Sequence, residues 1–189
     1  SGSVFPIGTT TNTFVVTDAS LNTATCSFDV TVTDSEVPTI TCNANIAVNN
    51  DNGVCGAVVS YTVTSNDNCS GSSVAQTAGL ASGSTFPIGT TTNTFVVTDA
   101  SNNTATCSFT VTVNDAEAPT ITCNANVNVS NDNGVCGAVV TYSNSSTDNC
   151  AGQTIAPTAG LLSGATFPVG TTTNSFTVTD ASNNTATCS

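Results

Sequence analysis

Thiols and carboxylates carry most of the chemistry that this sequence can perform. The 189-residue chain contains nine Cys and 12 Asp or Glu, but no Lys, Arg or His. Catalysis by a His base, a Lys Schiff base or an Arg clamp is therefore excluded, which leaves carboxylates, hydroxyls and thiols. Binding to nucleic acid or to an anionic membrane surface is excluded as well, because both require cationic side chains.

The cysteines recur with a period of 81 residues. The matching sets are Cys26, Cys107 and Cys188; Cys42 and Cys123; Cys55 and Cys136; Cys69 and Cys150. The motif Phe-Pro-(Ile/Val)-Gly-Thr-Thr-Thr-Asn begins at Phe5, Phe86 and Phe167 and returns at the same interval. A fixed period of this kind predicts a tandem array of one structural module.

The spacing of the cysteines favours disulfides. There is no Cys-x-x-Cys pair and no His, so a structural zinc site, the alternative, would need four scattered thiolates to meet through the fold. Disulfides predict an oxidising compartment, hence a secreted, extracellular or cell-surface protein. No apolar run approaches the length of a membrane-spanning helix, so we expect no membrane insertion in this segment.

The hydrophobic pattern has a period of two, as in Thr110-Val111-Thr112-Val113, and no segment shows helical spacing. The sequence therefore predicts an all-β fold. Asn52-Gly53 and Asn133-Gly134 predict hairpins between the first two long strands of a module, and Asn102-Asn103 predicts the turn of the last hairpin. About seven short strands in roughly 80 residues are typical of an immunoglobulin-like β-sandwich.

A family resemblance rests on a series of short motifs in one order. These are Pro38-Thr-Ile-Thr-Cys42, Val59-Ser-Tyr61, Asp67-Asn68, Phe86-Pro-Ile-Gly89, Thr98-Asp99 and Asn103-Thr-Ala-Thr-Cys107-Ser-Phe109. The series resembles the hyalin repeat (HYR) family. Tyr61 and Tyr142 stand where that family usually has Trp, and Asn43 and Asn124 where it has Pro. The resemblance implies tandem immunoglobulin-like modules of extracellular adhesive proteins and no enzyme.

On this pattern the chain divides into three parts. Residues 1–33 form the C-terminal part of a preceding repeat, 34–114 a complete repeat, and 115–189 a repeat lacking its last strand. We expect a slice of a longer chain. Cys26 should then pair with a cysteine upstream of residue 1.

The resemblance also implies a disulfide pairing. Simple HYR repeats carry two cysteines that match Cys42 and Cys107, and closing a loop of about 65 residues stabilises a domain by roughly 4 kcal/mol. Cys55 and Cys69 would form the second pair, although a straight strand after Cys55 would hold them too far apart. The alternative joins Cys42 to Cys69 and Cys55 to Cys107. In the next repeat the favoured scheme uses Cys123 with Cys188 and Cys136 with Cys150.

Carboxylates gather at one pole when the expected strands are traced. The candidate calcium ligands are Asp34, Glu36, Asp67 and Asp99 in one repeat and Asp115, Glu117, Asp148 and Asp180 in the next. Calcium takes six to eight oxygen ligands in irregular geometry. The acidic segment before Pro38 resembles the linkers through which cadherin repeats bind calcium. Alternatively, these are ordinary solvated turn residues. The tip at residues 49–52 is a weaker candidate, expected to approach the following repeat.

The function expected from these observations is structural. Disulfide-stapled modules with short linkers would form a stiff extracellular rod, as a surface filament or as the stalk of a large bacterial cell-surface adhesin. The partners would be neighbouring repeats or identical subunits, with a surface glycan or cell partner elsewhere in the parent protein. The alternative is a glycan- or receptor-binding adhesion module. Because the Asp sets repeat in every module, no catalytic residue is assigned.

Overall fold

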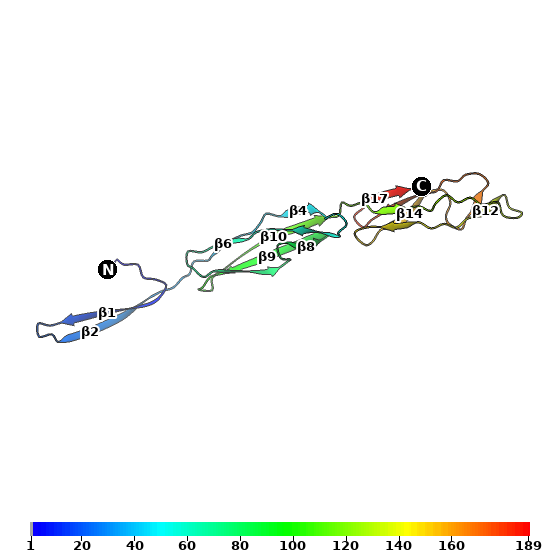
Figure 1. The fold of residues 1–189 in the computed structure, drawn as a ribbon. Helices are drawn as coiled ribbons and strands as arrows, with labels where there is room; N and C mark the ends of the chain where they lie inside the picture. The colour runs from blue at the N-terminus through cyan, green and yellow to red at the C-terminus, as the bar shows by residue number, and fades with distance from the viewer. Residues whose placement is uncertain (1) are drawn as a thin grey trace. The chain divides into compact units, whose positions relative to one another are not determined.

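The computed structural model describes residues 2–189, and all of their regular structure is β (Figure 1). In the first half of the chain the strands are β1 (Gly8–Thr17), β2 (Thr23–Val32), β3 (Thr39–Thr41), β4 (Ile46–Asn49), β5 (Gly56–Val59), β6 (Thr64–Asn66), β7 (Ser73–Ala78), β8 (Ser84–Pro87) and β9 (Gly89–Thr98). The later strands are β10 (Thr104–Asn114), β11 (Thr120–Thr122), β12 (Gly137–Val139), β13 (Ser145–Thr147), β14 (Thr154–Ala159), β15 (Thr166–Pro168), β16 (Ser175–Thr179) and β17 (Thr185–Cys188). The predicted all-β fold class is confirmed. No helix among the described residues could span a membrane.

The chain packs as two compact units. The first comprises residues 2–42, 62–78 and 94–108, and the second comprises 43–61, 79–93 and 109–189. Strands β9 and β10 run through both units, so the division passes through the second repeat rather than between repeats. Residues 49–56 of the second repeat and residues 114–117, where the third repeat begins, both lie in the second unit.

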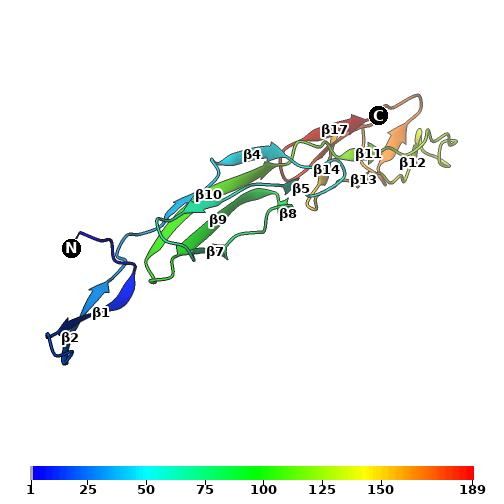
Figure 2. The ribbon, with the colours of Figure 1, turned by 60° about the vertical axis from the view of Figure 1, so that its left-hand side comes forward.

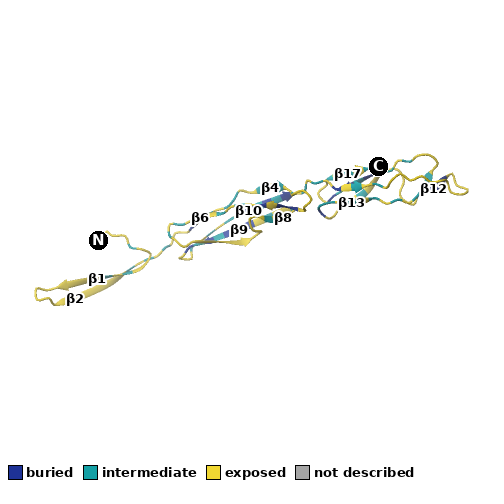
Figure 3. Cartoon of the chain, viewed as in Figure 1, coloured by how far each residue is buried: buried dark blue, intermediate teal, exposed yellow. Residues whose placement is uncertain are grey.

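In the first unit, β1 and β2 form a ten-residue antiparallel hairpin from Gly8↔Val32 to Thr17↔Thr23. Most of this hairpin is exposed (Figure 3). Phe14 is 59% and Phe28 is 54% exposed, although their rings stack at 6.0 Å. Their counterparts 81 residues later, Phe95 and Phe109, are 7% and 3% exposed. The same sequence is therefore buried where a complete module surrounds it.

The second repeat places its core on the alternating faces of β9 and β10. These strands belong to a sheet ordered β4-β10-β9-β7 (Figure 2). In addition, β3 pairs with β6 and β5 pairs with β8. Buried side chains include Phe86, Val97, Val111 and Val113. Because successive residues of a strand face opposite sides, the Thr residues between them are left nearer to solvent. Period-two patterning thus produced the sandwich that the sequence predicted.

The turn predictions had different outcomes. Asn102 has a positive φ of 69° between β9 and β10, so the last hairpin turns where expected. Residues 50–55 do not make a two-residue hairpin, because β4 and β5 belong to different sheets. Gly53 has a positive φ of 71° but Asn52 does not, and a type I′ turn requires both. The prediction of hairpins at the Asn-Gly dipeptides was therefore wrong.

The third repeat contains the corresponding short sheets, ordered β11-β13, β12-β15 and β14-β16-β17. In the second repeat β4 pairs in parallel with the end of β10, from Ile46↔Val111 to Asn49↔Asn114. The counterpart of β4, residues 127–130, forms no strand, and Val127 and Val129 are 47% and 60% exposed. Residues 111–114 thus pair with β4 in the second repeat, whereas residues 127–130 of the third repeat have no such partner strand among residues 2–189.

Candidate functional site at the joint between repeats

Two disulfides close individual repeats. Cys42 is bonded to Cys107 with a Cα–Cα distance of 5.8 Å, and Cys123 is bonded to Cys188 at the same distance. Both bonds are those of the favoured pairing scheme, and each links a residue next to the first strand of its repeat to the last strand. The alternative bonds, Cys42 with Cys69 and Cys55 with Cys107, are not formed.

The third disulfide crosses from one repeat to the next. Cys55 is bonded to Cys150, 95 residues later, with a Cα–Cα distance of 4.9 Å. The expected pairs Cys55 with Cys69 and Cys136 with Cys150 were therefore wrong. Strands β5 and β6 lie between Cys55 and Cys69 along the chain. A disulfide requires Cα atoms within about 7 Å, so the chain would have to bend sharply between these strands to join the two cysteines. Cys26, Cys69 and Cys136 form no disulfide within residues 2–189.

Hydrogen bonds surround this inter-repeat disulfide. Glu117 accepts a bond of 2.7 Å from the Gly53 backbone N–H, and the Ala116 N–H donates to Asn50 Oδ1 at 3.0 Å. From the other side, Asn149 Nδ2 donates to the Val54 carbonyl oxygen at 3.2 Å. The tip expected to approach the next repeat therefore does so, through Asn50 and its neighbours. These polar contacts hold the loop that precedes Cys55 against residues 116–117 and Asn149 of the following repeat.

The equivalent residues of the second repeat make different contacts. Glu36 lies 81 residues before Glu117 and accepts a 2.9 Å bond from Asn68, the counterpart of Asn149, within its own repeat. Glu36 and Asn68 are exposed, whereas Glu117 and Asn149 are half-buried. Likewise Cys69 is half-buried and Cys150 is buried. The same side chains thus exchange a contact with each other for contacts with the preceding repeat.

Two carboxylate triads occupy equivalent positions. Ligand oxygens of Asp34, Asp67 and Asp99 lie within 4.8 Å of one another, and so do those of Asp115, Asp148 and Asp180. The structure therefore brings together six of the eight predicted calcium ligands. Glu36 and Glu117 do not belong to the triads; their carboxylates bind Asn68 and Gly53 instead.

Asp99 is positioned by the turn that follows β9. Its carboxylate accepts bonds from the backbone N–H groups of Ser101 and Asn103 at 2.9 and 2.7 Å, and from Asn103 Nδ2 at 2.8 Å. Burial raises the pKa of Asp99, but these hydrogen bonds outweigh that effect and hold the pKa below its ordinary value. Asp180 makes the same contacts with Ser182 and Asn184. The buried member of each triad is thus held in place by its own turn.

Three of the other four triad members each retain one oxygen that is buried without a hydrogen-bond partner. These atoms are Asp67 Oδ1, Asp115 Oδ2 and Asp148 Oδ1, together with the neighbouring Asn149 Oδ1. An unpaired buried carboxylate oxygen is unfavourable unless a proton donor or a cation satisfies it. Hard oxygen ligands without nitrogen or sulfur are what calcium prefers. The donor set of each triad therefore fits a calcium ion, with further oxygen ligands such as water completing the coordination.

The triads lie beside the cysteines of the joint. Asp148 Oδ2 accepts a 3.1 Å bond from the Cys150 backbone N–H, as Asp67 does from Cys69 at 3.2 Å. Burial raises the pKa of the Cys69 thiol, and a hydrogen bond with Asp34 and the charges of Asp34, Asp67 and Glu36 raise it further. The loop that carries the disulfide cysteine and the loop that carries the acidic ligand are therefore one segment.

Sequence reasoning missed the partner of Cys55 and the roles of Glu117 and Asn149. The signal available was the exact repetition of four cysteine phases, which is equally compatible with bonds inside and between repeats. A bond from Cys55 to the position of Cys69 one period later preserves the same repetition. Spacing alone could not choose between the two patterns.

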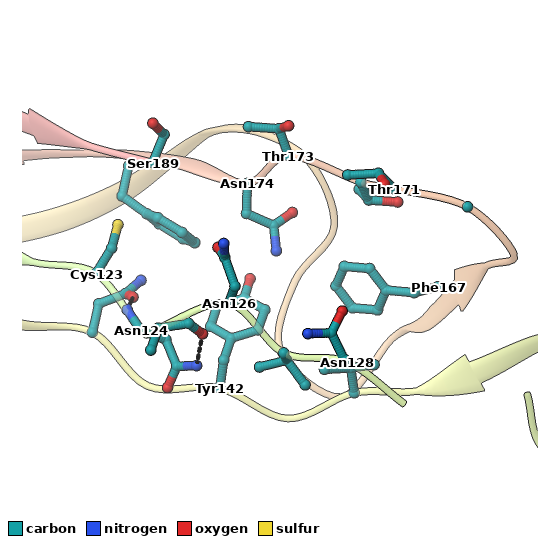
Figure 4. A pocket seen from close by; sticks show the side chains of 17 residues that line it. Cys123, Asn124, Asn126, Asn128, Tyr142, Phe167, Thr171, Thr173, Asn174 and Ser189 are labelled. Atoms are coloured by element: carbon teal, nitrogen blue, oxygen red, sulfur yellow. Dashed lines mark hydrogen bonds between the residues drawn. The ribbon is translucent and has the colours of Figure 1, made fainter. Parts of the chain in front are cut away.

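A cavity of about 510 Å³ opens in the third repeat (Figure 4). Asn126, Asn128, Tyr142, Phe167 and Asn174 are among the residues that line it. In the second repeat the counterpart of Asn126, Asn45, accepts a 2.9 Å bond from the Thr110 N–H. The counterpart of Tyr142, Tyr61, packs edge-on against Phe109 at 4.9 Å. The cavity therefore corresponds to the space that residues 109–113 fill one repeat earlier.

Comparisons with known proteins agree with the resemblance. The family model of the HYR domain matches residues 1–32, 33–113 and 114–189. These ranges differ by one residue from the boundaries read from the sequence. Hyalin of Strongylocentrotus purpuratus is 35% identical over 191 residues, which cover 98% of this chain and 16% of Hyalin.

Solved structures that match the chain include cadherin ectodomains. Extracellular cadherin domains 1–4 of protocadherin gamma B7 match with 11% identity and a TM-score of 0.40, covering 96% of this chain and 56% of that one. The protocadherin gamma B4 extracellular domain matches with 16% identity and a TM-score of 0.37, covering 96% and 37%.

The family match extends over the whole chain, and disulfides of the kind found here persist in oxidising, extracytoplasmic surroundings. This chain belongs to the HYR domain family of extracellular, adhesion-type repeat modules.

Proposed function

We propose that this chain is a structural segment of an extracellular array, in which the joints between HYR modules are fixed so that the array acts as a rod. The observation that carries the proposal is the Cys55–Cys150 disulfide, which ties one repeat covalently to the next. Glu117, Asn149 and the Ala116 N–H add hydrogen bonds around it. A joint held by a covalent bond and several polar contacts resists bending better than a linker alone.

The proposed setting is a surface filament or the stalk of a large cell-surface adhesin, as in bacteria. The chain spans 16% of Hyalin's length, so partners outside the segment belong to the proposal as well. With no Lys in the sequence, an internal isopeptide bond cannot supply tensile strength. Disulfides within and between repeats would supply it instead. No catalytic role is proposed, since the same acidic residues recur in each repeat rather than forming one specialised site.

Calcium is proposed as the second element of the joint. Asp115, Asp148 and Asp180 would bind it in the third repeat, and Asp34, Asp67 and Asp99 in the second. The cation would satisfy the buried oxygens of Asp67, Asp115 and Asp148 and offset the repulsion among three carboxylates. Because Asp148 and Cys150 share a loop, the ion would also order the loop that carries the inter-repeat disulfide.

Thermal unfolding of the oxidised chain with calcium and with chelator tests the calcium site. A site with a Kd of about 1 mM stabilises the fold by about 1.4 kcal/mol when calcium is tenfold higher. Asp148→Asn should reduce the gain, whereas Asp29→Asn, on an exposed strand outside the triads, should not. An unchanged melting temperature in the unmodified chain would remove calcium from the proposal.

Small-angle X-ray scattering tests the rod. The oxidised chain should keep one scattering profile across temperature, and reduction of the disulfides under native conditions should broaden the distribution of distances. The Cys55→Ser variant should resemble the reduced chain, while retaining the disulfides inside the repeats. If reduction and Cys55→Ser leave the profile unchanged, the inter-repeat disulfide does not set the stiffness of the joint.

The alternative function is recognition of a glycan or receptor. The third-repeat cavity, with its Asn side chains and Tyr142, is the observation in its favour. Its counterpart in the second repeat is filled by the chain's own strand β10, which argues for packing rather than ligand binding. A glycan array probed with the oxidised chain would separate the two functions, because saturable binding is expected only under the alternative.

A further inference from the structure

We propose that Cys69 and Cys136 are the two halves of further inter-repeat disulfides, so that the HYR array is covalently cross-linked at every joint. The partner of each is another HYR-type module with cysteines in the same phases. Cys69 would bond to the preceding module's counterpart of Cys55. Cys136 would bond to the following module's counterpart of Cys150. This inference rests on the proposed function in one respect, because it requires neighbouring modules in a tandem array.

Cys69 and Cys136 have the same positions within the 81-residue period as the two bonded cysteines of the described joint. Cys136 lies 81 residues after Cys55, and Cys69 lies 81 residues before Cys150. Cys55 and Cys150 are bonded to each other across the joint that the structure describes. Cys69 and Cys136 therefore occupy, within their own repeats, the two sequence positions that form this bond, and neither has a disulfide partner among residues 2–189.

The loop before Cys136 has the same fold as the loop before Cys55, a similarity that does not depend on the sulfur atoms. The Asp132 backbone N–H donates to the Gly137 carbonyl at 2.8 Å, and Asp51 donates to Gly56 at the same distance. Gly134 has a φ of 76°, close to the 71° of Gly53. The loop before Cys136 thus has the same backbone conformation as the loop that Glu117 and Asn149 bind at the described joint. Cys136, at the end of its loop, is exposed.

The residues that flank Cys69 also resemble those at the described joint. Glu36 and Asn68, which flank Cys69, are exposed and bonded to each other at 2.9 Å. Their counterparts, Glu117 and Asn149, have released one another and bind Gly53 and Val54 of the preceding repeat. Glu36 and Asn68 are the same residue types as Glu117 and Asn149. They could therefore bind a loop equivalent to residues 50–55 of a preceding module by giving up their bond to each other. The surface around Cys69 is therefore equipped for a module of this same kind.

Bond formation follows ordinary thiol–disulfide exchange with a small-molecule or protein disulfide as the oxidant. The thiolate of a Cys136-type residue attacks the oxidant, forms a mixed disulfide and releases one thiolate of the oxidant. The thiolate of the facing Cys69-type residue then attacks the Cys136-type sulfur and releases the second. The oxidant gains two electrons, the two protein thiols lose their protons to solvent, and one S–S bond forms between modules.

The test extends the full chain by one period. A copy of residues 109–189 is appended after Ser189, so that the third repeat gains a following module, and the copy of Ala118 is replaced by Met. The natural sequence contains no Met, so cyanogen bromide cuts this chain once. After folding with oxidised and reduced glutathione, the two fragments should remain joined until a reductant is added. Cys136, which is exposed and should react with maleimide in the 189-residue chain, should lose that reactivity in the extended chain.

The matched control is the same extended chain with Cys136→Ser, whose fragments should separate without reductant. Folding is checked by the Cys42–Cys107 and Cys55–Cys150 bonds in a disulfide map of the same sample. If both are present while Cys136 still reacts with maleimide and the fragments separate, the inference is overturned. This readout is a covalent bond, so it can fail while the rod and calcium tests succeed, and the reverse also holds.

Discussion

Glu117 holds Gly53 across the boundary between two repeats, with Oε2 2.7 Å from the backbone nitrogen. The bond is charge-assisted, and the same oxygen also lies 3.4 Å from Asn50 Nδ2. One carboxylate therefore organises the loop whose last residue is Cys55. Glu117 therefore binds the preceding repeat, whereas Asp115, two residues earlier, belongs to the carboxylate triad.

Glu117→Ala should destabilise the joint by roughly 1 kcal/mol, because a charged hydrogen bond is lost at a half-buried site. Urea denaturation of the oxidised chain measures the change. Glu36→Ala is the matched control, since Glu36 contacts only its own repeat and is exposed. Equal effects of the two substitutions would show that Glu117 contributes nothing specific to the joint.

The Cys55–Cys150 bond can be checked in the natural chain with one substitution. Ala118→Met places the only Met of the sequence at an exposed position near the start of the third repeat. Cyanogen bromide cleavage under denaturing, non-reducing conditions should then leave one covalent species, because Cys55 and Cys150 lie on opposite sides of the cut.

Reduction should release two fragments from that species. Two fragments without reductant would instead point to Cys55–Cys69 and Cys136–Cys150, the pairs that the sequence favours. Ala118→Met combined with Cys55→Ser is the control that should separate in either case.

Acid should unfold the chain partly through Asp99. Its pKa in the folded state is depressed, so the folded state binds its proton less readily than the unfolded chain. This contribution to stability is present above the unfolded pKa of about 3.9 and is lost as the pH falls through the lower folded value. Asp18, whose pKa is lowered first of all by the Asn22 side chain, adds to the same trend.

Stability measured by urea denaturation should therefore be flat from pH 8 to about 5 and should fall below about pH 4. Asp99→Asn should lower stability at neutral pH and make the dependence below pH 4 shallower. An Asp99→Asn curve parallel to that of the unmodified chain would contradict the assigned origin. Both curves are recorded with chelator present, so that calcium does not contribute.

The third-repeat cavity should accept a strand supplied in cis. Appending Phe-Thr-Val-Thr-Val, the sequence of residues 109–113, after Ser189 should bury its Phe and Val beside Tyr142 and Phe176. Burial of three such side chains is worth several kcal/mol, at about 1.5–3 kcal/mol each. The melting temperature should rise, and Val127 should become protected from hydrogen exchange as a strand forms.

Appending Ser-Thr-Ser-Thr-Ser is the matched control, because it supplies the same backbone without apolar side chains. A similar rise with both tails would mean that main-chain pairing, not filling of the cavity, accounts for the gain. No rise with either tail would show that the cavity is not the counterpart of the space occupied by Phe109.

The sequence by itself determined the features that depend on local pattern and on repetition. Alternation of Thr with Val and Phe specified strands and their inward faces, because side chains along a strand point to opposite sides. Asn102, which tolerates a positive φ, specified the last turn. The 81-residue period specified the modules, and the order of motifs specified the HYR family. The separation of Asp34, Asp67 and Asp99 by whole strands was enough to predict that they meet.

Only the tertiary structure decided which atoms join across the boundary between repeats. A periodic sequence is unchanged when a partner is moved by one period, so bonds from Cys55 to Cys69 and from Cys55 to Cys150 leave the same trace in the sequence. The choice depends on distance in space, since a disulfide requires Cα atoms within about 7 Å. The sequence likewise identified Glu117 as an acidic residue near the boundary between repeats. It could not show that Glu117 binds Gly53 and does not join Asp115 in the triad.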